Sequence, residues 1–235
     1  MSNEFKLRTS FILGDENIDL LNEKKVIIFG VGGVGSFAAE ALARVGIGNL
    51  TLVDFDEVDI TNVNRQIPAL HSTVGMNKVD VMKDRILDIN PDINIRIFKE
   101  KYFYENSEMF FDVKYDYVVD AIDMVTSKLG LIRYCYENDM KIISSMGMGN
   151  KIDPTKIEVT EIEKTHTDPL AKIMRKELKE RNLKKVKVVY STEQPVELKK
   201  RIVNGRKLTP GSISFVPSVG GLTIASVVVR DLLDL

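Results

Sequence analysis

Residues 26–35 read Val26-Ile27-Ile28-Phe29-Gly30-Val31-Gly32-Gly33-Val34-Gly35, four apolar residues followed by four glycines in six positions. A short, wholly apolar run is typical of a parallel strand that is buried on both faces. Glycines directly after such a strand allow a tight turn and let the backbone approach a phosphate closely. Residues 36–45 predict a helix, whose amino terminus would offer unpaired N–H groups to an anion.

A second apolar strand is expected over residues 50–53, which completes one β-α-β unit. It ends at Asp54, about 20 residues beyond the glycines, where a carboxylate can bind the hydroxyls of a ribose. The glycines alone would fit any tight strand-to-helix turn. Together with Asp54 they predict a nucleotide site, although these residues do not distinguish NAD from ATP.

The alternation of helices and strands continues along the chain. Helices are expected over 77–90 and 127–138, and strands over 93–98, 117–120 and 141–145. This order predicts a doubly wound, Rossmann-like α/β fold with a mostly parallel sheet. We expect a single domain over 1–235, with an N-terminal arm and short helix over 1–25 and a nucleotide-binding core over 26–150.

The remaining residues, 151–235, predict an α+β elaboration of the same domain. A half-exposed strand is expected over 156–162, a helix over 169–182, a strand over 186–190 and a polar loop over 192–212. The apolar run 220–229 is too short to span a bilayer, which needs about 20 residues. We therefore expect a buried helix or strand there and no membrane span.

Composition narrows the class of protein further. The chain has 235 residues, 44% of them hydrophobic, with 33 Lys and Arg against 34 Asp and Glu. These values exclude a disordered or collagen-like chain, and the length allows a full core. The single cysteine excludes an intrachain disulfide and a Cys-rich zinc site, and it fits a cytoplasmic protein.

Charged and amide side chains follow the second strand. A hydride-transfer enzyme needs no such set, whereas an enzyme that activates a phosphate uses Arg and Lys to neutralise the triphosphate and the departing pyrophosphate. Asp123 follows the third strand of the motif, at the same edge, where it suits a magnesium ligand. The set consists of Asp54, Asp56, Asn62, Arg65, Gln66, Lys78 and Asp123.

These motifs together resemble the ubiquitin-activating-enzyme-like adenylyltransferases of the ThiF/MoeB superfamily. The resemblance rests on residues 8–150 and implies ATP and Mg²⁺ as cofactors, with Asp54 on the ribose and Asp123 on magnesium. It places Gly30, Gly32, Gly33, Gly35, Asp56, Asn62, Arg65, Gln66 and Lys78 in the nucleotide site. It also implies a symmetric homodimer in which Arg8 from the partner's arm enters the site, so Arg8, Arg65, Lys78 and Asp123 are the predicted catalytic residues.

One branch of that superfamily is the most similar. Residues 152–157, 164–171 and 190–193 resemble the bacterial tRNA threonylcarbamoyladenosine dehydratases. This resemblance implies an ATP-dependent ligase or cyclase of tRNA modification. The threonyl carboxylate beside the anticodon would become an acyl-adenylate, which the carbamoyl group would then close into a ring. The partners implied are tRNA carrying threonylcarbamoyladenosine and a sulfur-transfer protein.

Two other functions stay open. The chain could adenylate the C-terminus of a ubiquitin-like sulfur carrier, but such enzymes usually bear two Cys-x-x-Cys zinc motifs, which one cysteine cannot supply. It could also be a nucleotide-sensing regulatory domain without catalysis, which the convergence of Arg65, Lys78 and Asp123 argues against. Cys135 is expected to be a buried packing residue, because it lies inside a predicted helix. His166 receives no role.

The C-terminal half carries an excess of positive charge. Residues 172–187 contain eight Lys or Arg and two Glu, and a second basic cluster lies over 199–207. Most such runs are simply solvated helix faces. A near-neutral protein with one basic end would nevertheless suit a protein that binds the tRNA backbone.

Overall fold

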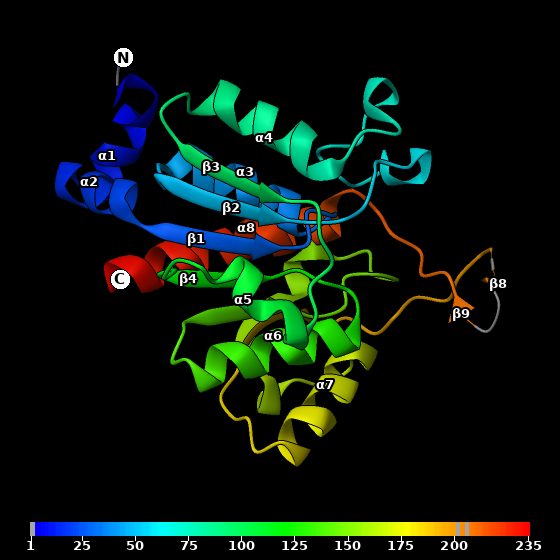
Figure 1. Cartoon of the computed structure of the whole chain (residues 1–235). Coiled ribbons are helices and arrows are strands. Elements are labelled where there is room, and N and C mark those ends of the chain that lie inside the picture. The colour runs from blue at the N-terminus through cyan, green and yellow to red at the C-terminus, as the bar shows by residue number, and fades with distance from the viewer. Residues whose placement is uncertain (1–2, 201–202, 205–206) are drawn as a thin grey trace.

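The computed structural model describes residues 3–200, 203–204 and 207–235. Seven strands form one sheet in the order β3-β2-β1-β4-β5-β7-β6 (Figure 1). They are β1 (Lys25–Phe29), β2 (Asn49–Val53), β3 (Asn94–Phe98), β4 (Tyr117–Asp120), β5 (Ile142–Ser145), β6 (Ile157–Glu161) and β7 (Lys187–Ser191). β6 pairs antiparallel with β7, and the other neighbouring pairs are parallel. The predicted doubly wound, mostly parallel sheet is confirmed.

Helices cover both faces of this sheet (Figure 1). On one face lie α3 (Gly35–Val45), α4 (Lys78–Ile89) and α8 (Phe215–Leu233), with α2 (Asp15–Glu23) against α8. On the other lie α5 (Ser107–Phe110), α6 (Val125–Glu137) and α7 (Pro169–Glu180). Shorter elements are α1 (Leu7–Leu13), η1 (Asn3–Lys6), η2 (Ile60–Asn62), η3 (His71–Thr73), η4 (Tyr104–Asn106), η5 (Pro154–Lys156), η6 (Ile162–Lys164), β8 (Val203–Asn204) and β9 (Lys207–Leu208).

The apolar run of β1 explains why the sheet is buried on both sides. Val26 and Ile28 belong to the cluster beneath α3 and α8, whereas Ile27 and Phe29 belong to the cluster beneath α5 and α6. All four side chains are fully buried. Side chains alternate between the faces of a strand, so a strand covered on both faces must be apolar at every position.

Two expectations for the connecting segments were wrong. The N-terminal arm forms a helix of its own, α1, in addition to the short helix that the sequence predicted. Gly14 separates α1 from α2 at a φ of +83°, a conformation that glycine adopts without strain. The expected loop over 192–212 contains the short antiparallel strands β8 and β9.

The C-terminal apolar run lies in α8. In length and composition this helix could cross a membrane, and it is the one such helix in the described ranges. However, 61% of its apolar window is buried inside the fold, where α8 packs against α3 and contacts β4 to β7. The burial is that of a core helix and agrees with the buried element predicted from the sequence.

Candidate nucleotide site and its acceptor side

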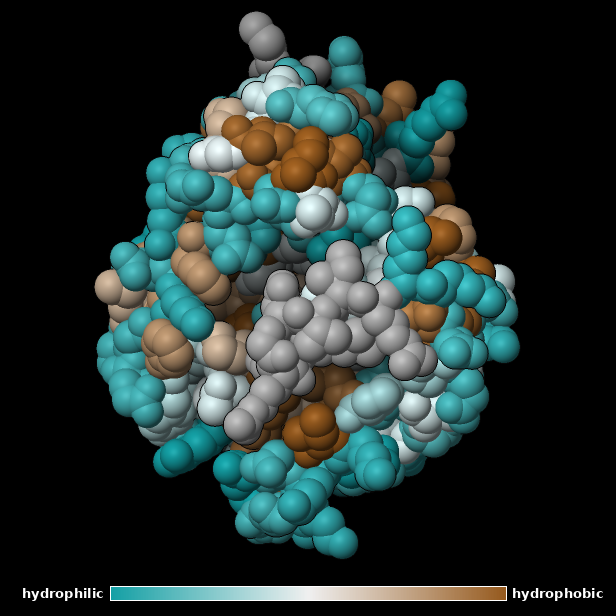
Figure 2. All heavy atoms as spheres, turned by 90° about the vertical axis from the view of Figure 1, so that its right-hand side faces the viewer, coloured by the Kyte–Doolittle hydropathy of each residue, from teal (hydrophilic) through white to brown (hydrophobic). Residues whose placement is uncertain are grey.

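A cavity of about 670 Å³ opens at the carboxyl ends of the parallel strands. The strand order reverses between β1 and β4, and ligands of open α/β sheets bind at such a reversal. Figure 2 looks onto this side of the molecule, where hydrophilic side chains surround hydrophobic patches. The volume lies within the range of small-molecule sites. The cavity is therefore the candidate functional site.

The glycine-rich loop forms the floor of the cavity between β1 and α3. Gly30 has a φ of +88°, and a Cβ on it would lie 2.6 Å from the carbonyl oxygen of Ala121. A Cβ on Gly35 would lie 1.8 Å from the carbonyl oxygen of Gly30. A side chain at Gly30 would push the loop away from the residues after β4, and one at Gly35 would force the two ends of the loop apart, so the turn needs glycine at both positions. The loop then leads directly into the amino terminus of α3, which favours an anion.

Asp54 follows β2 and braces the same loop. One carboxylate oxygen accepts the N–H of Val31 at 2.6 Å, and the other accepts the N–H of Asp56 at 2.9 Å. Burial raises the pKa of Asp54, although the charge of Lys78 and the two backbone hydrogen bonds oppose this. Each carboxylate oxygen keeps a second lone pair, so Asp54 can hold the loop and still accept a hydroxyl.

Lys78 is the first residue of α4, and its side chain lies at the cavity although the residue is only 5% exposed. Its ammonium donates to Asp56 at 2.8 Å. Asp56 is itself largely exposed, so a phosphate could replace it as the partner of the lysine. The pair thus keeps a buried cation at the cavity wall.

Arg65, Asn62 and Gln66 come from the segment after β2, around η2. The guanidinium of Arg65 donates to the carbonyl oxygen of Thr61 and to Asn64, at 3.0 and 2.9 Å, and has no ion-pair partner among the described residues. Burial lowers its pKa, yet an arginine remains charged in proteins. The buried oxygen of the Gln66 amide has no hydrogen-bond partner in the described structure. These groups are available to a ligand.

Asp123 lies in the loop after β4, exposed at the cavity. Its carboxylate makes no hydrogen bond or ion pair in the described parts of the chain. The loop is fixed from below by Asp120, which accepts the N–H of Ile122 at 3.1 Å and the ammonium of Lys128 at 2.8 Å. Asp123 is therefore positioned but unengaged, as a ligand for an ion or substrate would be.

Two predicted site residues do not line the cavity. Gly35 serves the packing of the loop, as described above. Arg8 is exposed on α1, which lies at the end of the sheet opposite to the cavity (Figure 1). Within one chain Arg8 cannot reach the site, so its predicted role requires a second subunit.

Sequence reasoning missed one whole wall of the cavity. This wall consists of Gly147, Met148, Gly149, Asn150, Asp168, Pro195, Pro210 and Gly211, from segments far apart in the chain. Asn150 joins them: it has a φ of +58°, its amide oxygen accepts the N–H of Gly211 at 2.6 Å, and its carbonyl oxygen accepts the N–H of Val196. No local pattern predicts that an asparagine after β5 will form hydrogen bonds with residues as distant in the chain as Val196 and Gly211.

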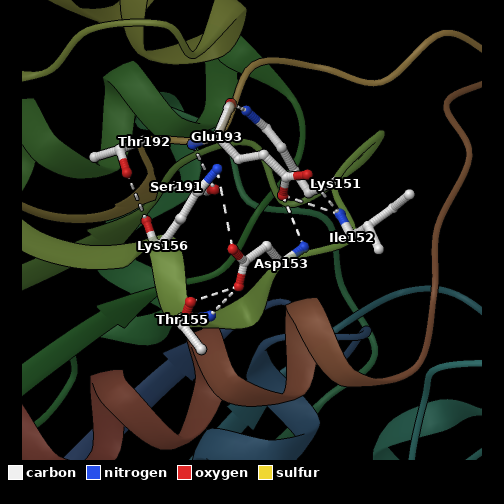
Figure 3. A network of polar contacts seen from close by, with 8 residues as sticks. All are labelled: Lys151, Ile152, Asp153, Thr155, Lys156, Ser191, Thr192 and Glu193. Atoms are coloured by element: carbon white, nitrogen blue, oxygen red, sulfur yellow. Dashed lines mark hydrogen bonds and ion pairs between the residues drawn. The ribbon is translucent and has the colours of Figure 1, made fainter.

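A network behind this wall ties the segment after β5 to the end of β7 (Figure 3). The Glu193 carboxylate accepts the N–H groups of Ile152 and Asp153, each at 2.9 Å. The ammonium of Lys151 donates to the carbonyl oxygen of Glu193, and both residues are buried. Such charge-assisted hydrogen bonds hold their partners firmly. The network keeps the wall in place.

The solvent exposure of Cys135 and His166 bears on whether either could have a chemical role. Cys135 is fully buried, and burial raises the pKa of its thiol, so it is the packing residue that the sequence predicted. His166 is exposed, with its ring edge-on to Tyr190. Within the described ranges, no three His, Cys, Asp or Glu side chains form a group that could hold a metal ion. Residues 201–202 and 205–206 of the second basic cluster lie outside the described residues.

The glycine loop lies where the strand order of the parallel sheet reverses, with Asp54 on one side and unpaired basic and acidic groups beside it. This arrangement defines a nucleotide-binding α/β protein. A model of the ThiF family matches residues 5–233. Over 237 residues the chain is 48% identical to the tRNA threonylcarbamoyladenosine dehydratase of Bacillus subtilis strain 168, covering 96% of this chain and 93% of that protein. The chain belongs to the ThiF family and, within it, to the tRNA threonylcarbamoyladenosine dehydratases.

Solved structures agree with this assignment. The crystal structure of the Escherichia coli tRNA N6-threonylcarbamoyladenosine dehydratase TcdA in complex with ATP superimposes with a TM-score of 0.91 at 36% identity, covering 99% of this chain and 95% of that one. A structure of the same enzyme in complex with AMP has a TM-score of 0.91 at 37% identity, with the same coverage.

Proposed function

We propose that this protein uses ATP to dehydrate threonylcarbamoyladenosine beside the anticodon of tRNA, closing the threonyl side group into a ring through an acyl-adenylate. The observation that carries the proposal is the convergence of Arg65, Lys78 and Asp123 around the glycine loop in one cavity. The relatives named for this activity match nearly the whole chain, and the Escherichia coli enzyme among them was solved in complex with ATP. A regulatory nucleotide sensor would not need this set of charges.

In the first step the threonyl carboxylate attacks the α-phosphorus of ATP, and pyrophosphate leaves. The loop and the amino terminus of α3 hold the phosphates, while Asp54 accepts hydroxyls of the ribose. Lys78 and Arg65 neutralise the charge that grows on the departing pyrophosphate. Lys78 exchanges Asp56 for a phosphate oxygen in doing so.

Asp123 fits a magnesium ligand because its carboxylate is exposed at the cavity and otherwise unengaged. Magnesium is usually held by one or two carboxylates together with substrate phosphates and water, which agrees with the lack of a larger acidic cluster in the described residues. When bound, Mg²⁺ would neutralise the phosphate charge. Removal of Mg²⁺ by a chelator should therefore abolish turnover.

The active form is proposed to be a homodimer in which Arg8 reaches the partner's cavity. The distance of α1 from the cavity of its own chain supports this arrangement (Figure 1). Exposed apolar side chains on α1 would favour burial against a second copy: Phe11 is 75% exposed and Ile12 is 85% exposed. A sulfur-transfer partner and a cytoplasmic location stay predictions that rest on the resemblance and on composition.

The decisive test is incubation of the protein with ATP, Mg²⁺ and tRNA that carries threonylcarbamoyladenosine. Mass spectrometry of the nucleosides should show the loss of one water, with AMP and pyrophosphate released and no reaction without ATP. Unchanged nucleoside in the presence of folded, ATP-binding protein would overturn the proposal. Adenylation of a small carrier protein ending in Gly-Gly would then favour the sulfur-carrier reaction.

A further inference from the structure

The cavity extends beyond the half that would hold the nucleotide. Asp54 follows β2, the glycine loop follows β1 and Asp123 follows β4, and this is also their order across the sheet. β5 is the next strand, three strands from β2, which is about 14 Å at the usual strand spacing of about 4.8 Å. The groups beyond β5 thus lie past the phosphates, on the side from which an acyl group would reach them.

Asp168 is the charged residue of that far side. It is the N-cap of α7, where one carboxylate oxygen (Oδ1) accepts the N–H of Ala171 at 2.6 Å. The other oxygen (Oδ2) is buried without a hydrogen-bond partner in the described structure. The residue is only 2% exposed and yet lines the cavity. A buried carboxylate oxygen without a donor is costly, because burial removes its water.

The surroundings show why the carboxylate is tolerated there. A Cβ on Gly147 would lie 2.8 Å from Oδ2, so the carboxylate occupies space that glycine leaves free. Burial raises the pKa of Asp168, opposed by the N–H of Ala171, the charge of Lys151 and the nearby backbone N–H groups of Gly147 and Leu170. Tyr190 is the other titratable group that faces Asp168 in the described chain. A carboxylate that is buried in this way accepts a proton more readily than an exposed one.

We propose that the β5 side of the cavity binds the carbamoyl group of the substrate and that Asp168 is the general base of ring closure, an inference that rests on the proposed function. Asp168 Oδ2 accepts an N–H of the carbamoyl group and takes its proton. The electron pair so released forms the new bond from the carbamoyl nitrogen or oxygen to the threonyl carbonyl carbon. The bond from that carbon to the AMP oxygen breaks, and AMP leaves with the bonding electrons.

A single substitution distinguishes the two functions of Asp168, as general base and as helix cap. Asparagine caps helices about as well as aspartate, so Asp168→Asn should keep the hydrogen bond to Ala171 and lose only the proton acceptor. Ring closure in a single turnover should fall by about 10²- to 10⁴-fold. Exchange of pyrophosphate into ATP, which needs tRNA bearing threonylcarbamoyladenosine but no ring closure, should stay within a few-fold of the wild-type rate.

Asp112→Asn is the control, because Asp112 pairs with Arg96 on the surface and does not line the cavity. It should leave both half-reactions unchanged. Should Asp168→Asn fail to fold, Gly147→Ala tests the same carboxylate, since the new methyl group must displace Oδ2. It too should slow ring closure and spare pyrophosphate exchange.

The outcomes are distinct. If Asp168→Asn closes the ring at the wild-type rate, the assignment of the base is overturned and the proposed function remains intact. The same follows if Asp168→Asn does not fold and a folded Gly147→Ala closes the ring at the wild-type rate. Equal loss of pyrophosphate exchange and closure also overturns it, because Asp168 would then serve binding or folding. Failure of the wild-type protein to cyclise the nucleoside overturns the proposed function itself.

Discussion

Lys128 is a lysine with no solvent exposure, and it holds together the ends of β4 and β5. Its ammonium donates to Asp120 at 2.8 Å, to Ser144 at 3.1 Å and to the carbonyl oxygen of Ser145 at 2.9 Å. Three oxygen acceptors satisfy the three ammonium donors, which is what a buried lysine requires. Because Asp120 also accepts the N–H of Ile122, this pair supports the loop that carries Asp123.

Lys128→Met should therefore destabilise the protein by about 3–5 kcal/mol, because it leaves Asp120 buried and unpaired. Adding Asp120→Asn should recover part of that loss, since the amide carries no charge and still offers an oxygen to Ile122. Urea unfolding of the wild type and both variants measures the difference. A Lys128→Met variant that is as stable as the wild type would show that the ion pair of Lys128 with Asp120 is not needed for stability.

Arg65→Ala should lower the rate of adenylate formation by about 10²-fold or more, because it removes a cation that stabilises the departing pyrophosphate. Pyrophosphate exchange measures this step directly. Arg133→Ala is a matched control, since Arg133 forms an exposed pair with Glu137 on α6 and does not line the cavity. An Arg65 variant that exchanges at the wild-type rate would remove Arg65 from the site.

At the scale of residues, the motifs located one half of the site and not the other. Gly30, Asp54 and Asp123 each follow a strand of the same β-α-β pattern, so sequence order alone brings them to one edge. Asp168 has no such local signal, because its sequence context shows an ordinary helix cap. Its unpartnered oxygen results from the packing of Gly147 against α7, which is a tertiary contact.

Helix α7 connects the cavity to the basic surface of the molecule. Its N-cap, Asp168, lies in the cavity wall. The helix buries Ala171, Met174 and Leu178 and exposes lysines at the spacing of one helix face. Lys172 and Lys179 have no ion-pair partner among the described residues. A helix with this arrangement could place tRNA phosphates beside the mouth of the cavity.

Replacing Lys172, Lys176 and Lys179 with Ala should weaken binding of tRNA and reduce the slope of log affinity against log salt by about one for each lost phosphate contact. Adenylate formation at saturating tRNA should change little. Affinity measured over a range of salt concentrations tests this. Lys24→Ala with Lys114→Ala, before the amino ends of β1 and β4, should not alter the slope. An unchanged slope in the α7 variant would contradict the role of this helix.

Helix α8 is fastened to the sheet through Asp231. Its carboxylate accepts the hydroxyl of Tyr117 on β4 at 2.6 Å and the ammonium of Lys187 on β7 at 2.5 Å. Burial alone would raise the pKa of Asp231, but the two hydrogen bonds outweigh it and hold the pKa below its ordinary value of 3.8. The folded state thus binds this proton less readily than the unfolded state does.

Asp231→Asn should lower the free energy of unfolding at neutral pH by about 1.5–3 kcal/mol, the usual contribution of a hydrogen bond to a charged group. The contribution is complete above pH 3.8 and is lost as the pH falls through the lowered pKa, so the two proteins should converge in acid. Thermal unfolding across this pH range measures it, with the exposed Asp234→Asn as control. A difference that persists unchanged in acid would assign the effect to packing.

At the scale of elements, period and composition predicted the sheet well, because each core strand must be apolar on both faces. The strands β6 and β7 and helix α7 were also located, since their patterns are regular. Helix α1 was missed: its apolar residues Phe11 and Ile12 face solvent in the single chain, so no buried face marks it. The wall over 195–212 was missed because it is held by Asn150 and not by local periodicity.

At the scale of the whole molecule, charge is divided between two regions although the net charge is −1. Asp54, Asp56 and Asp123 lie with Arg65 and Lys78 in the nucleotide half of the cavity. The lysines of α7 that are unpaired in the described chain lie beyond the other half, which follows β5. A surface that gathers its basic residues on one helix can attract a polyanion even when the net charge of the chain is near zero. Near-neutral composition therefore does not exclude binding of nucleic acid here.

The proposed symmetric dimer would explain both the exposed apolar residues of α1 and the distance of Arg8 from its own cavity. In a dimer with sites completed in trans, each cavity takes Arg65 from one chain and Arg8 from the other. Arg8→Ala and Arg65→Ala should each be nearly inactive as homodimers. A mixed dimer of the two variants contains one cavity that lacks both arginines and one that has both.

Mixing equal amounts of Arg8→Ala and Arg65→Ala under conditions that exchange subunits should restore about a quarter of the wild-type activity, because about half of the dimers are mixed and each has one complete cavity. Analytical ultracentrifugation verifies that the variants remain dimers. Mixing Arg65→Ala with Lys78→Ala is the control, since both residues belong to the cavity of their own chain and no complete site can form. No recovery beyond that control, with subunit exchange demonstrated, would place Arg8 outside the site and leave α1 only a structural role.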